Sequence, residues 1–318
     1  MKKLLSIFFC LALICSCTEK TEGPRVPVPP PPGVEEEDKK PEDNTQDNTQ
    51  DNTQDNTQGG TDKEETGTPM TVRFMSYNVG VFSKDKATLG HYSYPEVAAI
   101  FKEFNVDVAG LNETDNNRKR TEYQYQAKEL AKVLGTGWTY AFFDAIDGNY
   151  GNSIVAAPEY KVVKQWNKVT IQKLDGSETR SMGAIEYEDF VFCVTHLDHK
   201  SLNARLNGVK TITDWAKKNY GEGKTTKPVI LLGDMNCIPT EETITEFKKE
   251  WDLVSTTKEY TFNTNNPSKC IDFIFVLKNG AKYTKGESHA IQTAKTSDVK
   301  SASDHFPMYV DLTFNSQK

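Results

Sequence analysis

The sequence predicts an α/β protein in which two packed mixed sheets carry helices on their outer faces. Strand and helix patterns alternate from residue 70, strands dominate between residues 138 and 196, and no internal repeat interrupts this block. Such a mixed order is typical of two sheets that pack together and bury their outer faces under helices. The block is long enough for one large domain or two small ones.

The individual elements follow from the spacing of apolar residues. Apolar side chains at helical spacing, or segments of helical composition, predict helices over 97–104, 127–134, 203–218 and 240–250. Thr240 is the expected N-cap of the last helix. Runs of aliphatic and aromatic residues predict strands over 71–79, 106–111, 138–143, 152–157, 161–171, 182–187, 190–196, 229–232, 271–277 and 308–314.

The first residues have the pattern of an export signal. Lys2 and Lys3 precede an apolar run over residues 4–15, which is too short to span a bilayer. The run ends in Ile14-Cys15-Ser16-Cys17, which resembles a bacterial lipobox. In signals of that kind, cleavage would remove residues 1–16 and Cys17 would carry the acyl chains that anchor the protein. An ordinary secretory signal with chance cysteines is the alternative.

Residues 17–69 have the composition of a disordered tether. Four prolines in a row at 29–32 favour a stiff polyproline segment, and residues 43–58 are four copies of Asp-Asn-Thr-Gln. A tract with no aromatic residue and few aliphatic ones buries too little to offset the entropy lost on ordering. We therefore expect the folded domain to begin at residue 70 and to extend to residue 318.

The acidity of the chain belongs to this tether. Of the formal net charge of −7, residues 1–16 contribute +2 and residues 17–69 contribute −9, which leaves residues 70–318 balanced. A balanced block argues against a protein that holds nucleic acid by bulk positive charge. The three cysteines of the block, Cys193, Cys237 and Cys270, lack the spacing of a metal site and are expected to be buried.

Polar residues stand where several predicted strands end. Asn78 and His196 stand at the ends of such strands, Glu113 follows one, and Asn152 opens one after a glycine. Each of these has an ordinary structural explanation, such as an Asx turn, a helix cap or a hairpin turn. Together they would bring carboxylate, amide and imidazole groups to one edge of a sheet.

Three further segments carry a functional signal. Asp234 and Asn236 follow the most apolar strand, and side chains at i and i+2 of an extended segment point the same way. Asp272 lies inside an apolar strand, where a carboxylate is costly unless it has a partner such as a cation or a histidine. Asp304 and His305, just before the last strand, supply a carboxylate and an imidazole.

This set of groups predicts a hard cation and phosphoester chemistry. Oxygen ligands favour Mg²⁺, and Mn²⁺ or Ca²⁺ satisfy the same ligand chemistry. The chain has no Cys/His zinc spacing, no Gly-rich phosphate loop and no Gly-x-Ser-x-Gly elbow. A hard cation with few protein ligands leaves room for water and a phosphate oxygen, which suits phosphoester hydrolysis.

In their order along the chain, these motifs resemble those of the endonuclease/exonuclease/phosphatase superfamily, the deoxyribonuclease-I-like fold. The resemblance rests on Ser76-Tyr77-Asn78-Val79, Gly110-Leu111-Asn112-Glu113, Tyr150-Gly151-Asn152, Glu178-Thr179-Arg180, Thr195-His196-Leu197-Asp198, Gly233-Asp234-Met235-Asn236, Ile271-Asp272-Phe273 and Ser303-Asp304-His305. It implies a four-layer α/β/β/α sandwich with the site at one rim of the two sheets.

The resemblance also implies a role for each residue. Asn78, Glu113 and Asp304 would be the metal ligands, and Asp234 would orient or deprotonate the attacking water. The groups expected to contact or stabilise the phosphate are Asn152, Arg180, His196, Asn236 and His305, with Asp272 orienting His305. Asn112 stands where the family usually has glutamine, and Phe273 replaces the arginine of the inositol-polyphosphate phosphatase branch. The second departure argues against that branch.

The sequence therefore predicts a surface-tethered, divalent-metal-dependent phosphoesterase that cleaves an extracellular phosphodiester or phosphomonoester. The substrate stays open among nucleic acid, a lipid headgroup and a small molecule. An extracellular nuclease and a non-catalytic binding module on the same fold are the alternatives. The expected location is the bacterial cell envelope, at the outer membrane or cell surface, with the lipid anchor as the membrane contact and no feature that indicates an obligate protein partner.

Overall fold

The computed structural model describes residues 67–83 and 90–317. The chain divides into two units, residues 1–61 and residues 62–318, and all described residues belong to the second. The predicted signal, the lipidation of Cys17 and nearly all of the predicted tether lie outside the described residues. No helix in the described ranges is long and apolar enough to cross a membrane.

The first sheet has six strands in the order β12-β13-β1-β2-β4-β3. β1 and β2 run parallel to each other, and the other neighbours are antiparallel. The sheet is therefore mixed, as the sequence predicts. Its strands are β1 (Pro69–Asn78), β2 (Val108–Asp115), β3 (Thr139–Ile146), β4 (Tyr150–Ala156), β12 (Thr284–Ala290) and β13 (Met308–Asn315).

The second sheet has seven strands, six of them in the order β10-β11-β9-β8-β7-β5, with β6 also paired to β7. Here β8 and β9 are the parallel pair. The strands are β5 (Val162–Gln165), β6 (Val169–Ile171), β7 (Arg180–Tyr187), β8 (Val191–His196), β9 (Val229–Asp234), β10 (Trp251–Leu253) and β11 (Asp272–Leu277).

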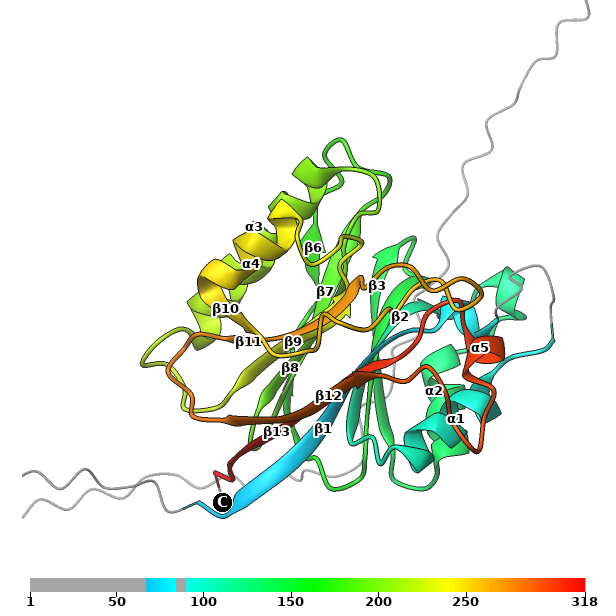
Figure 1. The fold of residues 1–318 in the computed structure, drawn as a ribbon, viewed down its shortest axis with the longest axis horizontal. Coiled ribbons are helices and arrows are strands. Elements are labelled where there is room, and N and C mark those ends of the chain that lie inside the picture. Colours follow the sequence, from blue (N-terminus) through cyan, green and yellow to red (C-terminus); the bar gives the residue numbers. More distant parts are fainter. Residues whose placement is uncertain (1–66, 84–89, 318) are drawn as a thin grey trace, which may run out of the picture. The chain divides into compact units, whose positions relative to one another are not determined.

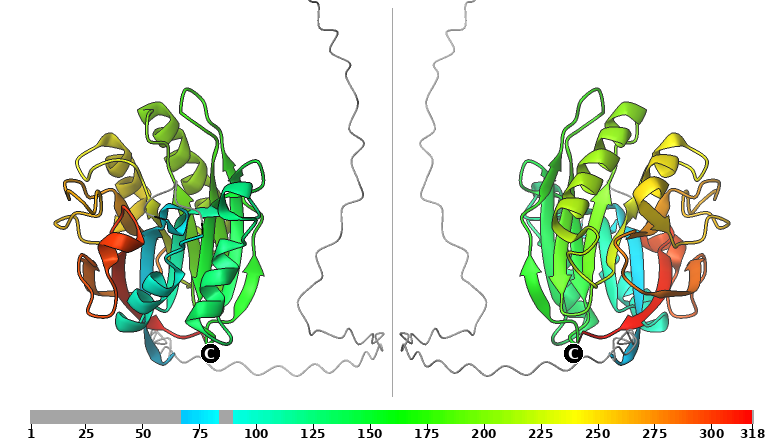
Figure 2. Two further views of the ribbon diagram at one scale, coloured as in Figure 1. Left: turned by 90° about the vertical axis from the view of Figure 1, so that its right-hand side faces the viewer. Right: turned by 90° about the vertical axis from the view of Figure 1, so that its left-hand side faces the viewer.

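Helices cover the outer face of each sheet, which completes four layers (Figures 1 and 2). α1 (Tyr94–Glu103), α2 (Gln126–Leu134) and the short α5 (Val299–Ala302) lie on the first sheet, and α3 (Leu202–Tyr220) and α4 (Glu242–Glu250) lie on the second. A cluster that includes Phe74, Phe192 and Phe273 fills the space between the sheets. The predicted α/β/β/α sandwich is confirmed.

The predicted elements differ from the structure in a few places. The single strand expected over 161–171 is two strands, β5 and β6, which both pair with β7. β10, β12 and α5 have no apolar pattern in the sequence that predicts a strand or a helix. β12 is a solvent-exposed edge strand, so it needs no apolar face, and β10 has only three residues.

The expected N-cap of α4 is wrong. Glu241, not Thr240, precedes the helix, and its side chain makes no capping hydrogen bond. It accepts instead from the Ile238 backbone N–H at 3.0 Å and pairs with Arg205 at 3.0 Å. Cys193, Cys237 and Cys270 are unpaired and buried, as expected.

Candidate active site

The polar strand ends meet at one edge of the two sheets. In the second sheet His196 lies beside Asp234, and Asp234 lies beside Asp272, in directly opposed register. In the first sheet Asn78 is opposite Asn112. Each sheet has its parallel pair at its centre, so the carboxyl ends of that pair lie at one edge of the sheet. Hydrogen bonds from Asn78 and Asn112 to the ends of β8 and β9 bring the two edges together at one rim.

A break in the strand pairing turns Glu113 into the pocket. The β2–β4 register shifts between Leu111 and Thr114, and Glu113 has a left-handed backbone with φ of 56°. A β-bulge of this kind redirects a side chain, and a non-glycine residue at positive φ is costly unless its surroundings hold it. Glu113 thereby lines the pocket while its neighbour Asn112 remains fully buried.

A glycine allows the approach of Asp234. Gly233 has φ of 146°, and a Cβ atom there would lie 1.8 Å from the Thr195 backbone oxygen. Only glycine lets β9 pass so close to β8 in this conformation. Asp234, the next residue, is 2 % exposed at the floor of the pocket.

Asp234, Asp272 and His305 form a buried cluster of alternating charge. His305 Nδ1 lies 2.9 Å from an Asp272 carboxylate oxygen, and His305 Nε2 lies 3.7 Å from Asp234. Burial opposes protonation of His305, but the charge and hydrogen bond of Asp272 prevail and raise its pKa. Burial, and then the charge of Asp272, raises the pKa of Asp234. His305 is therefore the cation of this cluster.

His196 stands on the other side of Asp234 and is neutral. Burial, and then the nearby Arg180, lowers its pKa well below the usual value. The Asn236 amide donates to His196 Nε2 at 2.9 Å and to the Leu197 backbone oxygen at 3.0 Å. Both amide hydrogens of Asn236 are thus engaged within the protein, so the predicted bond to a phosphate oxygen requires the release of one of them.

Asn78 holds the carboxylates of the site in place. Its Nδ2 donates to Glu113 at 3.2 Å and to Asp234 at 3.1 Å, while its Oδ1 accepts from the Gly80 backbone N–H at 3.1 Å. The predicted metal-ligand role would use this same Oδ1, which already accepts one hydrogen bond. In this geometry Asn78 fixes Glu113 relative to Asp234.

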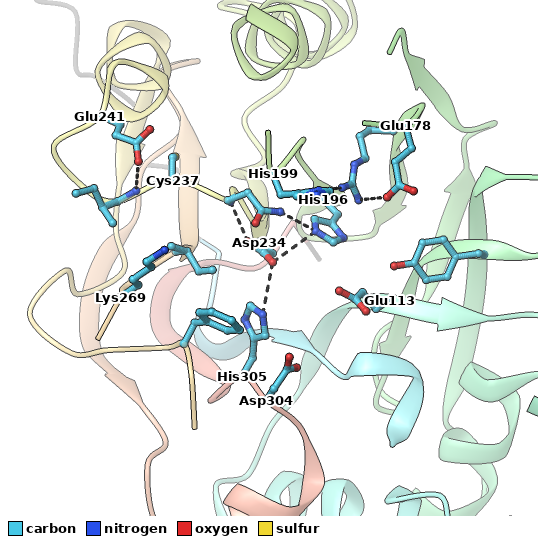
Figure 3. A pocket seen from close by; sticks show the side chains of 16 residues that line it. Glu113, Glu178, His196, His199, Asp234, Cys237, Glu241, Lys269, Asp304 and His305 are labelled. Atoms are coloured by element: carbon cyan, nitrogen blue, oxygen red, sulfur yellow. Dashed lines mark hydrogen bonds and ion pairs between the residues drawn. The ribbon is translucent and has the colours of Figure 1, made fainter. Parts of the chain in front are cut away.

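These groups surround an open pocket of about 490 Å³. Figure 3 shows Glu113 and Asp304 at its wall beside Asp234, with His196 and His305 flanking Asp234. The lining residues among the predicted set are Glu113, Arg180, His196, Asp234, Asn236, Asp304 and His305. Asn78, Asn152 and Asp272 lie behind this wall, each at most 1 % exposed.

Asn152 therefore supports the site from behind. Its Oδ1 accepts from Asn112 at 2.8 Å, and its Nδ2 donates to the Ser181 backbone oxygen at 3.0 Å. With these bonds made, the predicted contact between Asn152 and phosphate is not available in this geometry. Arg180 does line the pocket, where it pairs with Glu178 at 3.0 Å and lies 3.4 Å from His199 Nδ1.

Sequence reasoning did not assign three residues that matter here: Asn112, Tyr150 and His199. Tyr150 lines the pocket, and burial followed by the charge of Glu113 raises its pKa, so its hydroxyl stays protonated. His199 also lines the pocket. Tyr150 belongs to the motif Tyr150-Gly151-Asn152, and His199 directly follows the motif that ends at Asp198. Their position next to a strand end is the sequence signal that could have identified them.

Asn112 joins the two sheets. Its Oδ1 accepts from the Asp234 backbone N–H at 2.8 Å, and its Nδ2 donates to the Thr195 backbone oxygen at 2.8 Å as well as to Asn152. A side chain of β2 thus satisfies backbone groups of β8 and β9. The length of asparagine suits this bridge between the sheets.

We expect Asn112→Ala to lower the free energy of unfolding by about 2–4 kcal/mol. The substitution would leave the buried N–H of Asp234 and the oxygen of Thr195 without partners, and each buried unpaired group costs about 1–3 kcal/mol. Urea unfolding at pH 7 measures the change. Asn219→Ala removes an asparagine that bonds one helix carbonyl near the surface, and it should shift the midpoint far less. Equal shifts in the two variants would contradict the bridging role.

The donor set at the pocket wall fits a hard divalent cation. Glu113 and Asp304 supply carboxylate oxygens that are partly exposed to the pocket. Asp234, Asp272 and His305 also have ligand atoms within 4.8 Å of one another. That buried cluster, however, already balances a protonated imidazole between two carboxylates, so the wall of Glu113 and Asp304 is the better site for an ion.

The layered fold and an acidic, imidazole-bearing pocket at the strand ends are shared by hydrolases that act on phosphoester bonds. The model of the Endonuclease/Exonuclease/phosphatase family matches residues 75–305. The chain belongs to this family, as the motifs predicted. No curated protein matches it.

Solved structures of the family share the fold at low sequence identity. A family protein from Bacteroides thetaiotaomicron aligns with TM-score 0.62 and 20 % identity over 78 % of this chain and 99 % of that chain. A mannosyl-6-phosphatase from the same organism aligns with TM-score 0.61 and 22 % identity over 76 % and 99 %. Caenorhabditis elegans TDP2 aligns with TM-score 0.57 and 16 % identity over 76 % and 97 %.

Proposed function

We propose that this protein is a divalent-metal-dependent phosphoesterase that works outside the cell while tethered to a membrane. The observation that carries the catalytic part is the position of Asp234 between two imidazoles, His196 at 3.5 Å and His305 at 3.7 Å, at the floor of a pocket walled by Glu113 and Asp304. A pocket of this kind can accept a phosphate, an ion and a water molecule together.

Glu113 and Asp304 would hold the ion, with Asn78 keeping Glu113 in place through its amide. When bound, Mg²⁺ or a similar cation supplies Lewis-acid stabilisation of charge on the phosphoryl group. The same donor set suits Mn²⁺ and Ca²⁺. Tyr150, protonated beside Glu113, would donate a hydrogen bond at the same wall.

Asp234 would orient the attacking water and accept its proton. The raised pKa of Asp234 makes it a stronger base than an ordinary carboxylate. His305, kept cationic by Asp272, would stabilise the negative charge that develops on the phosphoryl oxygens. Arg180 and His196 lie close enough to this floor to add positive charge and a polar contact at the same phosphate.

The substrate class that we favour is a phosphomonoester of a small molecule. One of the structural neighbours is a mannosyl-6-phosphatase, and the balanced net charge of residues 70–318 argues against binding nucleic acid by bulk positive charge. Side-by-side assays of mannose 6-phosphate, bis-p-nitrophenyl phosphate, sphingomyelin and plasmid DNA test this choice. Preference for DNA over the other substrates would favour the nuclease alternative.

Metal binding should depend on Glu113. We expect Glu113→Gln to weaken the binding of Mn²⁺ at least tenfold, because the substitution removes a ligand charge from the wall. Calorimetric titration of the metal-free protein measures this, and EDTA should stop hydrolysis. Glu222→Gln, an exposed surface change, serves as the control. An absence of metal binding by the wild-type protein would leave the binding-module alternative.

The tether is a separate part of the proposal. A lipidated Cys17 followed by a polar linker would place the catalytic domain at the surface of the outer membrane or cell, within reach of extracellular substrates. Cys17→Ser should move the protein from the membrane fraction to the soluble fraction of cells that express it. Cys15→Ser is the matched control, and an unchanged membrane fraction in Cys17→Ser would refute the anchor.

A further inference from the structure

A hairpin beside His305 forms one wall of the pocket. We name residues 261–269 the Phe262 hairpin. Phe262 and Lys269 exchange backbone hydrogen bonds of 2.9 and 2.8 Å at its base. Phe262 also forms an isolated bridge with His305, and the Phe306 backbone N–H donates to the Thr261 oxygen at 2.7 Å. The hairpin is therefore joined to the segment that carries the catalytic imidazole.

A second set of bonds fixes the hairpin to the carboxylate segment. The Thr264 backbone N–H donates to the Asp304 backbone oxygen at 3.0 Å, and the Thr264 hydroxyl donates to the Ser303 backbone oxygen at 3.0 Å. Thr264 is fully buried. Thr261, Phe262 and Thr264 thus bond directly to the 303–306 segment, and Lys269 is bonded through its backbone to Phe262. These bonds fix the backbone of the hairpin relative to Asp304 and His305.

Two side chains of the hairpin face the pocket, Phe262 and Lys269. The Phe262 ring lies with its centroid 4.8 Å from that of His305, and the side chain is only partly covered. It offers an apolar surface directly beside the predicted phosphate position. Lys269 is exposed and lies across the pocket from Glu178 (Figure 3).

The charges around the pocket leave Lys269 unneutralised. Arg180 pairs with Glu178, and Glu241 pairs with Arg205, each at 3.0 Å. Within the described part of the chain, Lys269 has no hydrogen bond or ion pair from its ammonium group. Arg180 also lines the pocket, but its charge is paired with Glu178. An unpaired ammonium group on a rigid wall is available to a ligand.

We propose that the Phe262 hairpin selects phosphoesters whose organic group carries a second negative charge. Lys269 would bind that charge, and Phe262 would pack against the organic group between it and the phosphate. This inference rests on the proposed function, because it names the class of phosphoester that the same pocket accepts. Sugar bisphosphates and phosphorylated carboxylic acids are members of this class.

The contribution of Lys269 should appear in binding more than in chemistry. Its charge would contact a group that does not react, and such a contact stabilises the substrate and the transition state equally. Removing it should therefore raise KM and leave kcat nearly unchanged. Because the ammonium group is exposed, the effect should weaken as ionic strength rises.

Three aromatic phosphates test the proposal: phenyl phosphate, 3-carboxyphenyl phosphate and 4-carboxyphenyl phosphate. Each carboxylate adds one negative charge to the same ring, and the two carboxylates lie at different distances from the phosphate. The measured quantity is kcat/KM for each carboxylated substrate divided by kcat/KM for phenyl phosphate, compared between wild type and variant. Intrinsic differences in leaving-group reactivity cancel in that comparison.

We expect Lys269→Gln to lower this ratio about three- to five-fold for at least one carboxylated substrate, the size typical of an exposed charge pair. Lys269→Arg should restore most of it, and Lys269→Glu should lower it further. The control is Lys285→Gln, which removes the same charge from β12 outside the pocket. An unchanged ratio in Lys269→Gln would overturn the proposal while leaving the phosphoesterase intact. If the wild-type protein hydrolyses none of the three substrates, that result would overturn both this proposal and the proposed phosphoesterase function.

Discussion

Replacing Asp234 by asparagine should reduce turnover by about 10²–10⁴-fold, the range typical of a lost general base. The introduced amide could not accept a proton from the attacking water, although it would keep nearly the same shape at the pocket floor. The variant should remain folded, because Asp234 is one carboxylate of a cluster that retains Asp272 opposite His305. Steady-state rates at saturating metal and substrate measure the effect, and a melting curve checks the fold.

The matched control for this prediction is Asp252→Asn. Asp252 is an exposed carboxylate on β10, bonded to Tyr283 at 3.0 Å, and does not line the pocket. It should keep full turnover. More than a tenth of wild-type turnover in Asp234→Asn, with an unchanged pH profile, would remove Asp234 from the role of base.

Replacing Asp272 by alanine should lower the free energy of unfolding by about 3–5 kcal/mol, since it leaves the buried His305 without its closest counter-charge. Asp272 is completely buried, and its Oδ2 lies 2.9 Å from His305 Nδ1. Its other oxygen, Oδ1, has no hydrogen-bond partner in the described structure. Most of the stabilisation of this carboxylate therefore comes from His305, and the two groups depend on each other. Urea unfolding at pH 7 gives the magnitude.

A comparison with Asp272→Asn separates charge from shape. Asparagine could still accept a hydrogen bond from His305, but it would not raise the pKa of that imidazole as the carboxylate does. We expect intermediate stability together with a turnover close to that of Asp272→Ala. Wild-type turnover in Asp272→Asn would show that the cation on His305 is not needed for the reaction.

The layers of the fold could be predicted because most strands and helices bury a continuous apolar face. The run at 229–232 forms the first four residues of β9, and the helical spacing at 127–134 belongs to α2. The exceptions have a common cause. β12 is exposed along most of its length and β10 is very short, so neither requires an apolar pattern, and their pairing with β13 and β11 holds them in place.

The same distinction applies to the candidate site. Asp234, Asp272 and His305 could be singled out from the sequence because a charged or polar residue inside or beside an apolar strand needs a partner. Asn112 and Lys269 could not be assigned in this way. An asparagine that bonds to the backbone of another sheet looks like any turn residue, and a lysine in a polar loop looks like a solvated side chain.

The sequence by itself determined most of the strands and helices, their buried apolar faces, and several polar groups that require partners, since these follow from hydrophobicity and desolvation along the chain. The tertiary structure decided which partners those groups found. Three local backbone features set the direction of the side chains in the pocket. They are the bulge at Glu113, the left-handed conformation of Asn236 and the close approach of Gly233 to β8. Such features arise from the packing of one sheet against the other, because only that packing brings atoms from distant segments within hydrogen-bonding distance.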